Sequence, residues 1–299
     1  MLGVLTAFSI ILAVIFIGWF LAARGIISSD RERLVLNKVA FYAATPALLF
    51  SSVARSDPGV VLSPVIVVIV LSAVIVAAIY AAFFWRKGIA ELASGAAAAS
   101  YFNAVNIGLP VSQYVLGDST YAIPAVFVQM VLFTPLILGA LGGKSLLGGI
   151  KTGLLSPMVL ASALGFIVAW QDWHIPAPIM EPLALLGGAS IPLILLSFGA
   201  SLKTAGVLSD RSSRPATYTA TALKLVGLPA VAYGLSLALG LSPEHTYAAV
   251  ILCALPTAQQ VYNYAATFQR GQSVSRDTVF ITTFASLPVM LVIAFLFGH

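Results

Sequence analysis

Two apolar stretches of this chain carry the residues whose types and spacing could do chemistry. Residues 101–113 read YFNAVNIGLPVSQ and residues 255–264 read LPTAQQVYNY, so each stretch combines a proline with side-chain amides. A proline inside a membrane helix frees backbone groups, and such an interruption survives only where protein or water satisfies them. Two interrupted helices that cross would direct half-helix N-termini, which carry partial positive charge, at one point. This arrangement favours the non-covalent binding of an anion.

Side-chain amides would give such a site its specific hydrogen bonds. The predicted substrate-binding residues in the two stretches are Asn103, Asn106, Pro110, Pro256, Gln259, Gln260 and Asn263. Ser51 and Ser197, which occupy equivalent places in a repeat, are added to this set. Each residue also has a structural alternative, because Asn and Gln often only tie one membrane helix to another. The symmetric pair of polar breaks is what favours a site.

Lys224 is the one basic residue well inside an apolar run. It follows Arg214 by about ten residues, which is too far from a helix end for its amine to reach the headgroups. It is predicted to be either a counter-charge for an anion or an amine held by neighbouring backbone carbonyls. No Asp or Glu is expected deep in any apolar run, so the sequence predicts no ion-coupling residue, no metal ligands and no cofactor.

The composition is that of a membrane protein. Of the 299 residues, 60% are hydrophobic and only 8% are charged, whereas soluble domains carry about a quarter charged residues. Apolar stretches of about 20 residues recur, and each is long enough to cross a bilayer as a helix. They lack the alternation of a β-barrel. The lipid bilayer is therefore the main partner, and the net charge of +5 is assigned to cytoplasmic loops and not to nucleic-acid binding.

Charged residues, glycines and prolines divide the chain into ten apolar segments. The spans are predicted at 2–23, 34–54, 60–85, 91–114, 119–141, 150–170, 177–201, 215–240, 245–268 and 277–297. If both termini lie outside, the cytoplasmic connections hold 13 of the 15 basic residues, in agreement with the positive-inside rule. These are Arg24, Arg31, Arg33, Lys38, Arg86, Lys87, Lys144, Lys151, Lys203, Arg211, Arg214, Arg270 and Arg276. The predicted location is the cell membrane, in multi-pass form.

The chain contains an internal repeat. Pro46 and Pro192 lie 146 positions apart, and Ser51 and Ser197 keep that offset. Two further matches follow in order, Leu109-Pro110 with Leu255-Pro256 at 146 and Val126-Phe127 with Val279-Phe280 at 153. The change of offset predicts seven extra residues after Pro256.

The repeat predicts two five-helix halves, at 1–141 and 150–299. Because five is odd, the second half must enter the membrane from the opposite side, so the repeat is inverted, which is typical of secondary transporters. The predicted fold class is an all-α polytopic membrane protein with ten transmembrane helices in a 5+5 inverted repeat. The interrupted fourth and ninth helices are expected to cross.

Three runs resemble the auxin efflux carrier family: Asn106-Ile-Gly-Leu-Pro110, Leu255-Pro256-Thr-Ala and Pro46-Ala-Leu-Leu-Phe. The chain is similar to a compact prokaryotic-type member of this family, which belongs to the bile/arsenite/riboflavin transporter superfamily and includes plant auxin exporters in another branch. The resemblance implies the fold of bile-acid symporters and sodium/proton antiporters, with a scaffold and a transport domain. It implies crossing helices at Pro110 and Pro256 and a small carboxylate substrate, either auxin-like or malate- or malonate-like. Asn103, Asn106 and the polar run after Pro256 would line the site.

The sequence therefore favours a secondary transporter that moves a small organic anion by alternating access. The main alternative is a sodium-coupled organic anion symporter of the same fold. An intramembrane enzyme is disfavoured because the three histidines fall in loops or at the chain end and no HExxH motif occurs. A channel or receptor fits neither the repeat nor the short loops. The identity of the anion, the direction, the coupling ion and the oligomeric state stay open, with a homodimer among the options.

Overall fold

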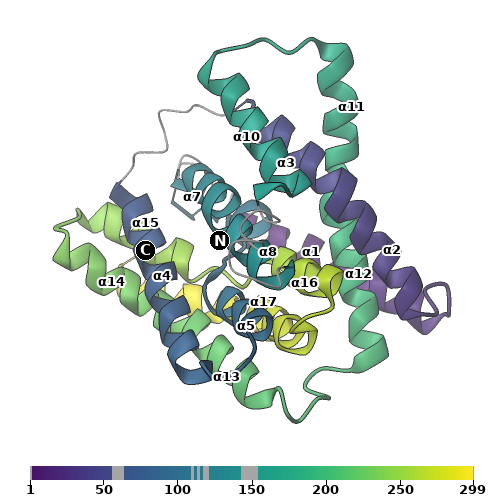
Figure 1. The fold of residues 1–299 in the computed structure, drawn as a ribbon. Coiled ribbons are helices and arrows are strands. Elements are labelled where there is room, and N and C mark those ends of the chain that lie inside the picture. Colours follow the sequence, from purple (N-terminus) through teal and green to yellow (C-terminus); the bar gives the residue numbers. More distant parts are fainter. Residues whose placement is uncertain are drawn as a thin grey trace.

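The computed structural model describes residues 2–55, 64–108, 111–112, 115–116, 121–142 and 154–298, and helices make up nearly all of its regular structure (Figure 1). The α-helices are α1 (Leu2–Ala23), α2 (Asp30–Val39), α3 (Thr45–Val53), α4 (Pro64–Phe84), α5 (Ile89–Ser100), α7 (Ile123–Val128), α8 (Thr134–Gly142), α10 (Pro157–Trp170), α11 (Ala177–Gly188), α12 (Ser190–Ala205), α13 (Arg214–Ala222), α14 (Leu228–Ala238), α15 (Pro243–Cys253), α16 (Gln259–Phe268) and α17 (Gln272–Leu296). Four segments are π-helical: η1 (Ala40–Ala44), η3 (Ala104–Gly108), η5 (Gln129–Phe133) and η6 (Leu223–Gly227). The all-helical prediction is confirmed.

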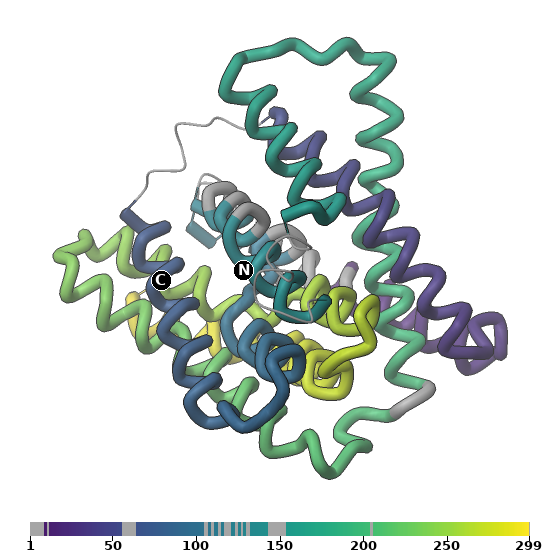
Figure 2. The backbone as a smooth tube through the Cα atoms, in the orientation of Figure 1, coloured from purple at the N-terminus to yellow at the C-terminus, as the bar shows by residue number. Residues whose placement is uncertain are grey.

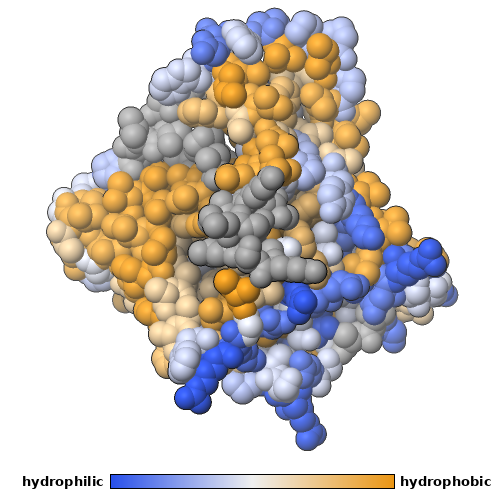
Figure 3. All heavy atoms as spheres, viewed as in Figure 1, coloured by the Kyte–Doolittle hydropathy of each residue, from blue (hydrophilic) through white to orange (hydrophobic). Residues whose placement is uncertain are grey.

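Several helical stretches have the length and composition of membrane spans. Within the described residues, five are long and apolar enough: Asp30–Val53, Pro64–Phe84, Ala177–Lys203, Arg214–Ala238 and Gln272–Leu296. Hydrophobic side chains cover the flank formed by α4 and α14 and the face of α10, whereas hydrophilic side chains gather at the top and along the lower right of the view (Figure 3). The chain is therefore a multi-pass membrane protein.

Prolines explain where the helices widen. Each π-helical segment described in the structure ends two residues before a proline, and these prolines are Pro46, Pro110, Pro135 and Pro229. Proline has no N–H to donate, and its ring clashes with the carbonyl of the preceding turn. A π-turn spaces its hydrogen bonds one residue wider and so accommodates that lost bond within the helix. At Pro46, Pro135 and Pro229 the helix consequently continues through the bend.

Glycines bring two pairs of helices into backbone contact. A Cβ atom on Gly18 of α1 would overlap the backbone of Leu196 in α12. In the second pair, a Cβ atom on Gly165 of α10 would lie 2.9 Å from the carbonyl oxygen of Phe50 in α3. Because small residues let membrane helices approach closely, α1 packs on α12 and α10 packs on α3.

Replacing Gly199 of α12 with alanine should destabilise the protein, because the new methyl group would overlap the carbonyl of Ile15 in α1. Overpacking of this kind costs about 1–3 kcal/mol, and thermal unfolding of the purified protein in detergent measures it. The control is Gly234→Ala in α14, where nothing lies within 4 Å of the added Cβ. This control should be neutral or slightly stabilising. Equal melting temperatures for the two variants would contradict the close packing of α1 on α12.

The ninth predicted segment forms the centre of the molecule. Every residue from 246 to 266 is buried, and α16 passes beside α5 in the middle of the bundle (Figure 2). This segment unwinds between α15 and α16, at residues 254–258, so the predicted break at Pro256 is found. In the first half the described break lies at 101–103, between α5 and η3. It therefore begins well before Pro110, which lies outside the described residues.

Candidate functional site

The two interrupted stretches pair with each other. Phe102 and Thr257 form an isolated antiparallel bridge. The backbone N–H of Asn103 donates to the Pro256 carbonyl at 2.8 Å, and the backbone N–H of Ala258 donates to the Tyr101 carbonyl at 3.2 Å. Backbone groups that the helix interruptions free are thus satisfied by the opposite stretch, which is what burial in a membrane protein requires. We refer to residues 101–103 and 254–258 together as the crossing.

Neighbouring helices form further hydrogen bonds with backbone and side-chain groups of the crossing. The Thr257 hydroxyl donates to the Ala98 carbonyl at 2.7 Å, and the Thr257 N–H donates to the Thr282 hydroxyl at 3.1 Å. The Gln129 side chain donates to the Phe102 carbonyl at 3.0 Å. Helices α5 and α17 and the π-helical segment η5 therefore all hold the two stretches in place.

Two of the predicted amides meet at the crossing. The Asn103 Nδ2 atom donates to the Gln259 Oε1 atom at 2.8 Å, and both side chains are buried. Gln260 and Asn263 follow on α16 and are also buried. The Gln260 Oε1 atom and both amide atoms of Asn263 lack a hydrogen-bond partner among the described residues. Because a buried amide without partners is costly, this part of α16 has unused hydrogen-bonding capacity in the described structure.

Lys224 also reaches the crossing. Its Nζ atom donates to the Cys253 carbonyl at 2.9 Å and lies 5.6 Å from the centre of the Phe102 ring. The Cys253 carbonyl belongs to the last turn of α15, where carbonyls have no partner within the helix. Of the two predicted alternatives, the structure shows the amine held by a backbone carbonyl. Lys224 is fully buried, so its amine lies in the same buried region as the crossing.

The predicted serines lie elsewhere on the helices. The Ser51 hydroxyl donates to the Leu48 carbonyl at 3.1 Å, and the Ser197 hydroxyl donates to the Arg33 carbonyl at 3.3 Å. Each described bond goes to backbone outside the crossing, so the structure does not bring either hydroxyl to the paired amides. The side chain of Asn106 and the whole of Pro110 lie outside the described residues.

A buried hydroxyl network was not foreseen from the sequence. The Tyr101 hydroxyl lies 3.0 Å from the Thr134 hydroxyl, which lies 3.3 Å from the Tyr264 hydroxyl. The two tyrosine rings pack edge to face at 6.4 Å. This network joins the end of α5, the start of α8 and the middle of α16. The sequence feature that could have indicated this network is the tyrosine near each polar break, Tyr101 in one stretch and Tyr264 in the other.

Three charges assigned to loops or span ends are buried in helices. Arg33, Arg276 and Asp277 are each at most 6% exposed. Arg276 pairs with Asp277 at 2.8 Å, and Asp277 also accepts from the Leu208 N–H at 3.0 Å. Asp277 lies in the second turn of α17, because this helix begins at Gln272 and not at 277, so it is buried near the helix start and not deep in the span. The adjacent guanidinium compensates the burial of this carboxylate.

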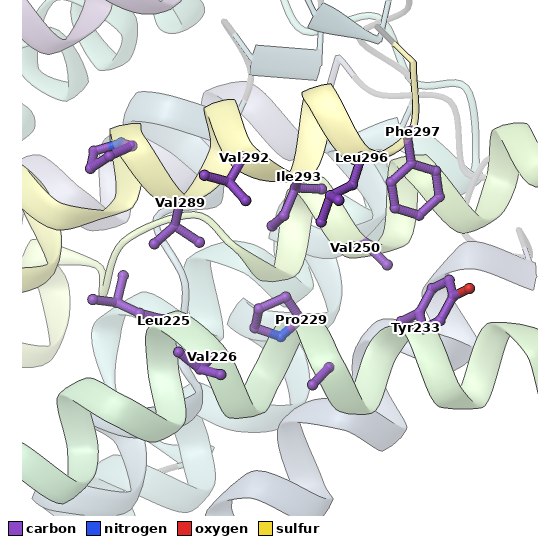
Figure 4. Close-up of a pocket in the computed structure, with 12 residues that line it drawn as sticks. Leu225, Val226, Pro229, Tyr233, Val250, Val289, Val292, Ile293, Leu296 and Phe297 are labelled. Atoms are coloured by element: carbon purple, nitrogen blue, oxygen red, sulfur yellow. The ribbon is translucent and has the colours of Figure 1, made fainter.

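One groove in the structure is apolar and lies outside the crossing. It has a volume of about 890 Å³ and opens between η6 and α14 on one side and α17 on the other (Figure 4). Tyr233 is its one residue with a polar side chain. Such a lining suits lipid chains better than an anion, so the candidate site remains the crossing. Among the described residues, no group of three or more His, Cys, Asp or Glu side chains could hold a metal ion.

Comparison with known proteins supplies the family. The family model described as "Membrane transport protein" matches residues 4–142 and 144–294. A Methanothermobacter thermautotrophicus protein named "Uncharacterized transporter" is 27% identical over 290 residues, covering 93% of each chain. A Rhizobium meliloti protein named "Putative malonate transporter" is 28% identical over 295 residues, covering 92% of this chain and 90% of its own. Since the family model spans nearly the whole chain, this protein belongs to the membrane transport protein family, which is the auxin efflux carrier family.

Proposed function

We propose that the protein is a secondary transporter that moves a small organic anion by alternating access, with the substrate bound at the crossing. The pairing of the two interrupted stretches carries this proposal. It places the amides of Asn103 and Gln259 and the amine of Lys224 in one buried region. Interrupted helices in corresponding positions of two repeats mark the substrate site in many secondary transporters.

The contacts between helices support ten spans in a 5+5 inverted repeat. The contact of Gly18 with Leu196 has its counterpart in the contact of Gly165 with Phe50. The glycines lie 147 positions apart and their partners 146, as expected if a two-fold relation exchanges the halves. Two five-helix halves, at 1–141 and 150–299, would be related in this way.

The offset between the halves changes earlier than the sequence matches suggested. Helices α5 and α15 begin 154 positions apart and end 153 positions apart. The extra residues of the second half therefore lie before the crossing, between the start of α12 and the start of α15. With this offset the predicted insertion after Pro256 is not needed, and Pro256 corresponds in our proposal to Asn103, 153 positions earlier.

Surface charge supports the proposed orientation, with both termini outside and the protein in the cell membrane. The exposed basic residues among the described positions of the predicted cytoplasmic set are Arg24, Arg31, Lys38, Arg86, Lys87, Lys203, Arg211 and Arg270. Hydrophilic side chains occupy the lower right of the view, beside the connection of α1 to α2 and the beginning of α5 (Figure 3). Short connections on the cytoplasmic side collect Lys and Arg in this way.

The proposed substrate is a small carboxylate. The name of the Rhizobium relative assigns malonate to that protein, and a dicarboxylate of this size offers four oxygen acceptors to amide and ammonium donors. An auxin-like monocarboxylate is the other member of the class. The sodium-coupled symporter differs from this proposal only in its coupling ion, and one experiment can test both.

Thermal unfolding of the purified protein should reveal the ligand class. We expect malonate to raise the melting temperature without sodium, because a ligand that binds only the folded state stabilises it by about 2.7 kcal/mol at a hundred times its Kd. Matched titrations with malate, indole-3-acetate and chloride test selectivity at equal ionic strength. Stabilisation that appears only with sodium would favour the symporter. If no carboxylate stabilises the protein more than chloride does, the proposed substrate class is wrong.

A further inference from the structure

One face of α2 and the segment that continues it lies against α16. Arg33, Asn37 and Phe41 recur every four residues and so lie on one side of the helix. At one end of this face, an Nη1 atom of Arg33 donates to the Tyr262 hydroxyl. At the other end, the Phe41 ring packs edge to face on the Tyr264 ring at 6.3 Å. Asn37 therefore faces α16 between these two contacts.

Asn37 is a buried amide with unused hydrogen-bonding capacity. It is 0% exposed. Neither its Oδ1 nor its Nδ2 atom has a hydrogen-bond partner in the part of the chain that the structure describes. Buried side-chain amides are nearly always bonded, since leaving them without partners is costly. An amide in this position on a helix interface is explained if a ligand supplies the missing partners.

Arg33 places a positive charge one turn from this amide. Its guanidinium lies 3.0 Å from the Asp30 carboxylate, but the Asp30 side chain is 71% exposed while that of Arg33 is 7% exposed. Water therefore screens the carboxylate more than it screens the guanidinium. The interface thus combines positive charge with neutral hydrogen-bonding groups.

We propose that Arg33, Asn37 and Tyr262 form a second carboxylate-binding site, at the contact of α2 with α16. A guanidinium and an amide N–H are the donors that a carboxylate prefers. Asn37 lies seven residues after Asp30, about 10 Å along the helix. Gln259 at the crossing and Tyr262 at this site lie on the same helix, α16, so an anion bound here would be on its way between the exposed Asp30 end of α2 and the crossing. This site rests on the proposed anion transport.

The test compares Asn37→Leu with the parent protein and uses malonate as the probe. If the amide serves only the ligand, leucine removes two unbonded polar atoms, so the melting temperature without malonate should stay equal or rise. Calorimetry on the purified protein should show that malonate binding at this second site is at least tenfold weaker, while binding at the crossing is kept. Asn37→Ala provides a second variant in case leucine does not fit. Ser236→Ala is the control, because it also removes a buried polar group without a described partner, the Ser236 hydroxyl on α14.

The outcomes separate this site from the proposed function. If the parent protein binds malonate and either folded Asn37 variant binds it equally well, the second site is wrong and the transport proposal stands. If the parent protein binds neither malonate nor any other carboxylate, the proposed substrate class fails, and the second site fails with it. A Ser236→Ala variant that loses affinity as much as Asn37→Leu does would also overturn the site. If the Asn37 variants lose affinity for malonate and Ser236→Ala does not, the result supports the second site.

Discussion

Replacing Asn103 with leucine should abolish transport and destabilise the protein. The substitution removes the Asn103 donor of the 2.8 Å hydrogen bond between the two side-chain amides of the crossing. The buried Gln259 Oε1 atom then loses this hydrogen bond. An unsatisfied buried acceptor costs about 1–3 kcal/mol, so the melting temperature should fall. Uptake of labelled malonate into proteoliposomes should fall at least tenfold. Both quantities are measured on protein that elutes as a single species in detergent.

A matched double variant distinguishes a binding role from a structural tie. When both partners of a buried hydrogen bond become apolar groups of similar shape, the loss of stability is small. Asn103→Leu/Gln259→Leu should therefore recover much of the lost melting temperature while transport stays absent. The double-mutant cycle isolates the pair energy. Full transport by the stable double variant would show that these amides only join the two stretches.

Replacing Lys224 with methionine should have the second large effect. The change keeps the length of the side chain but removes the charge and the donor that reaches the Cys253 carbonyl at 2.9 Å. Hydrogen bonds to charged groups contribute about 1.5–3 kcal/mol, which corresponds to about a 10- to 100-fold loss of transport if the bound anion uses this charge.

Lys224→Arg is the control, because it keeps both charge and donor. We expect the arginine variant to keep most of the parent's transport and the methionine variant to lose about 10- to 100-fold, in the same proteoliposome uptake assay. The melting temperature of the methionine variant should fall only slightly, because removing a buried charge offsets part of the loss of its hydrogen bond. A large loss of transport with little loss of stability would therefore indicate a role of Lys224 in anion binding. A methionine variant that transports at the parent rate would mean that Lys224 serves only the end of α15.

The sequence identifies the two stretches that pair in the structure, because their signals are local. The amides and Pro256 interrupt apolar runs, and the structure brings Asn103 and Gln259 together. The position of the first break was not readable in the same way. A proline in an apolar run predicts an interruption, but π-turns accommodate Pro46, Pro135 and Pro229 within the helices. The break at 101–103 depends on partners from distant helices, such as Gln129.

The burial of Arg33, Arg276 and Asp277 could not be predicted by counting charges. The positive-inside rule counts Lys and Arg near span ends but does not tell an exposed loop residue from one in the first buried turns. For Arg33 a local signal existed. Ser29 and Glu32 are spaced as in a capping box, and the Ser29 hydroxyl accepts from the Glu32 N–H at 3.3 Å. That motif starts α2 at Asp30 and places Arg33 within the helix.

The most direct test of the transport mechanism is counterflow of malonate in proteoliposomes. Vesicles loaded with unlabelled malonate are diluted into labelled malonate, without sodium, and the accumulation of label is followed. A carrier that exposes one site alternately to either side should accumulate label transiently above equilibrium, and the Asn103→Leu/Gln259→Leu variant should not. Label that only equilibrates, or transient accumulation that persists in the double variant, would contradict a substrate site at the crossing.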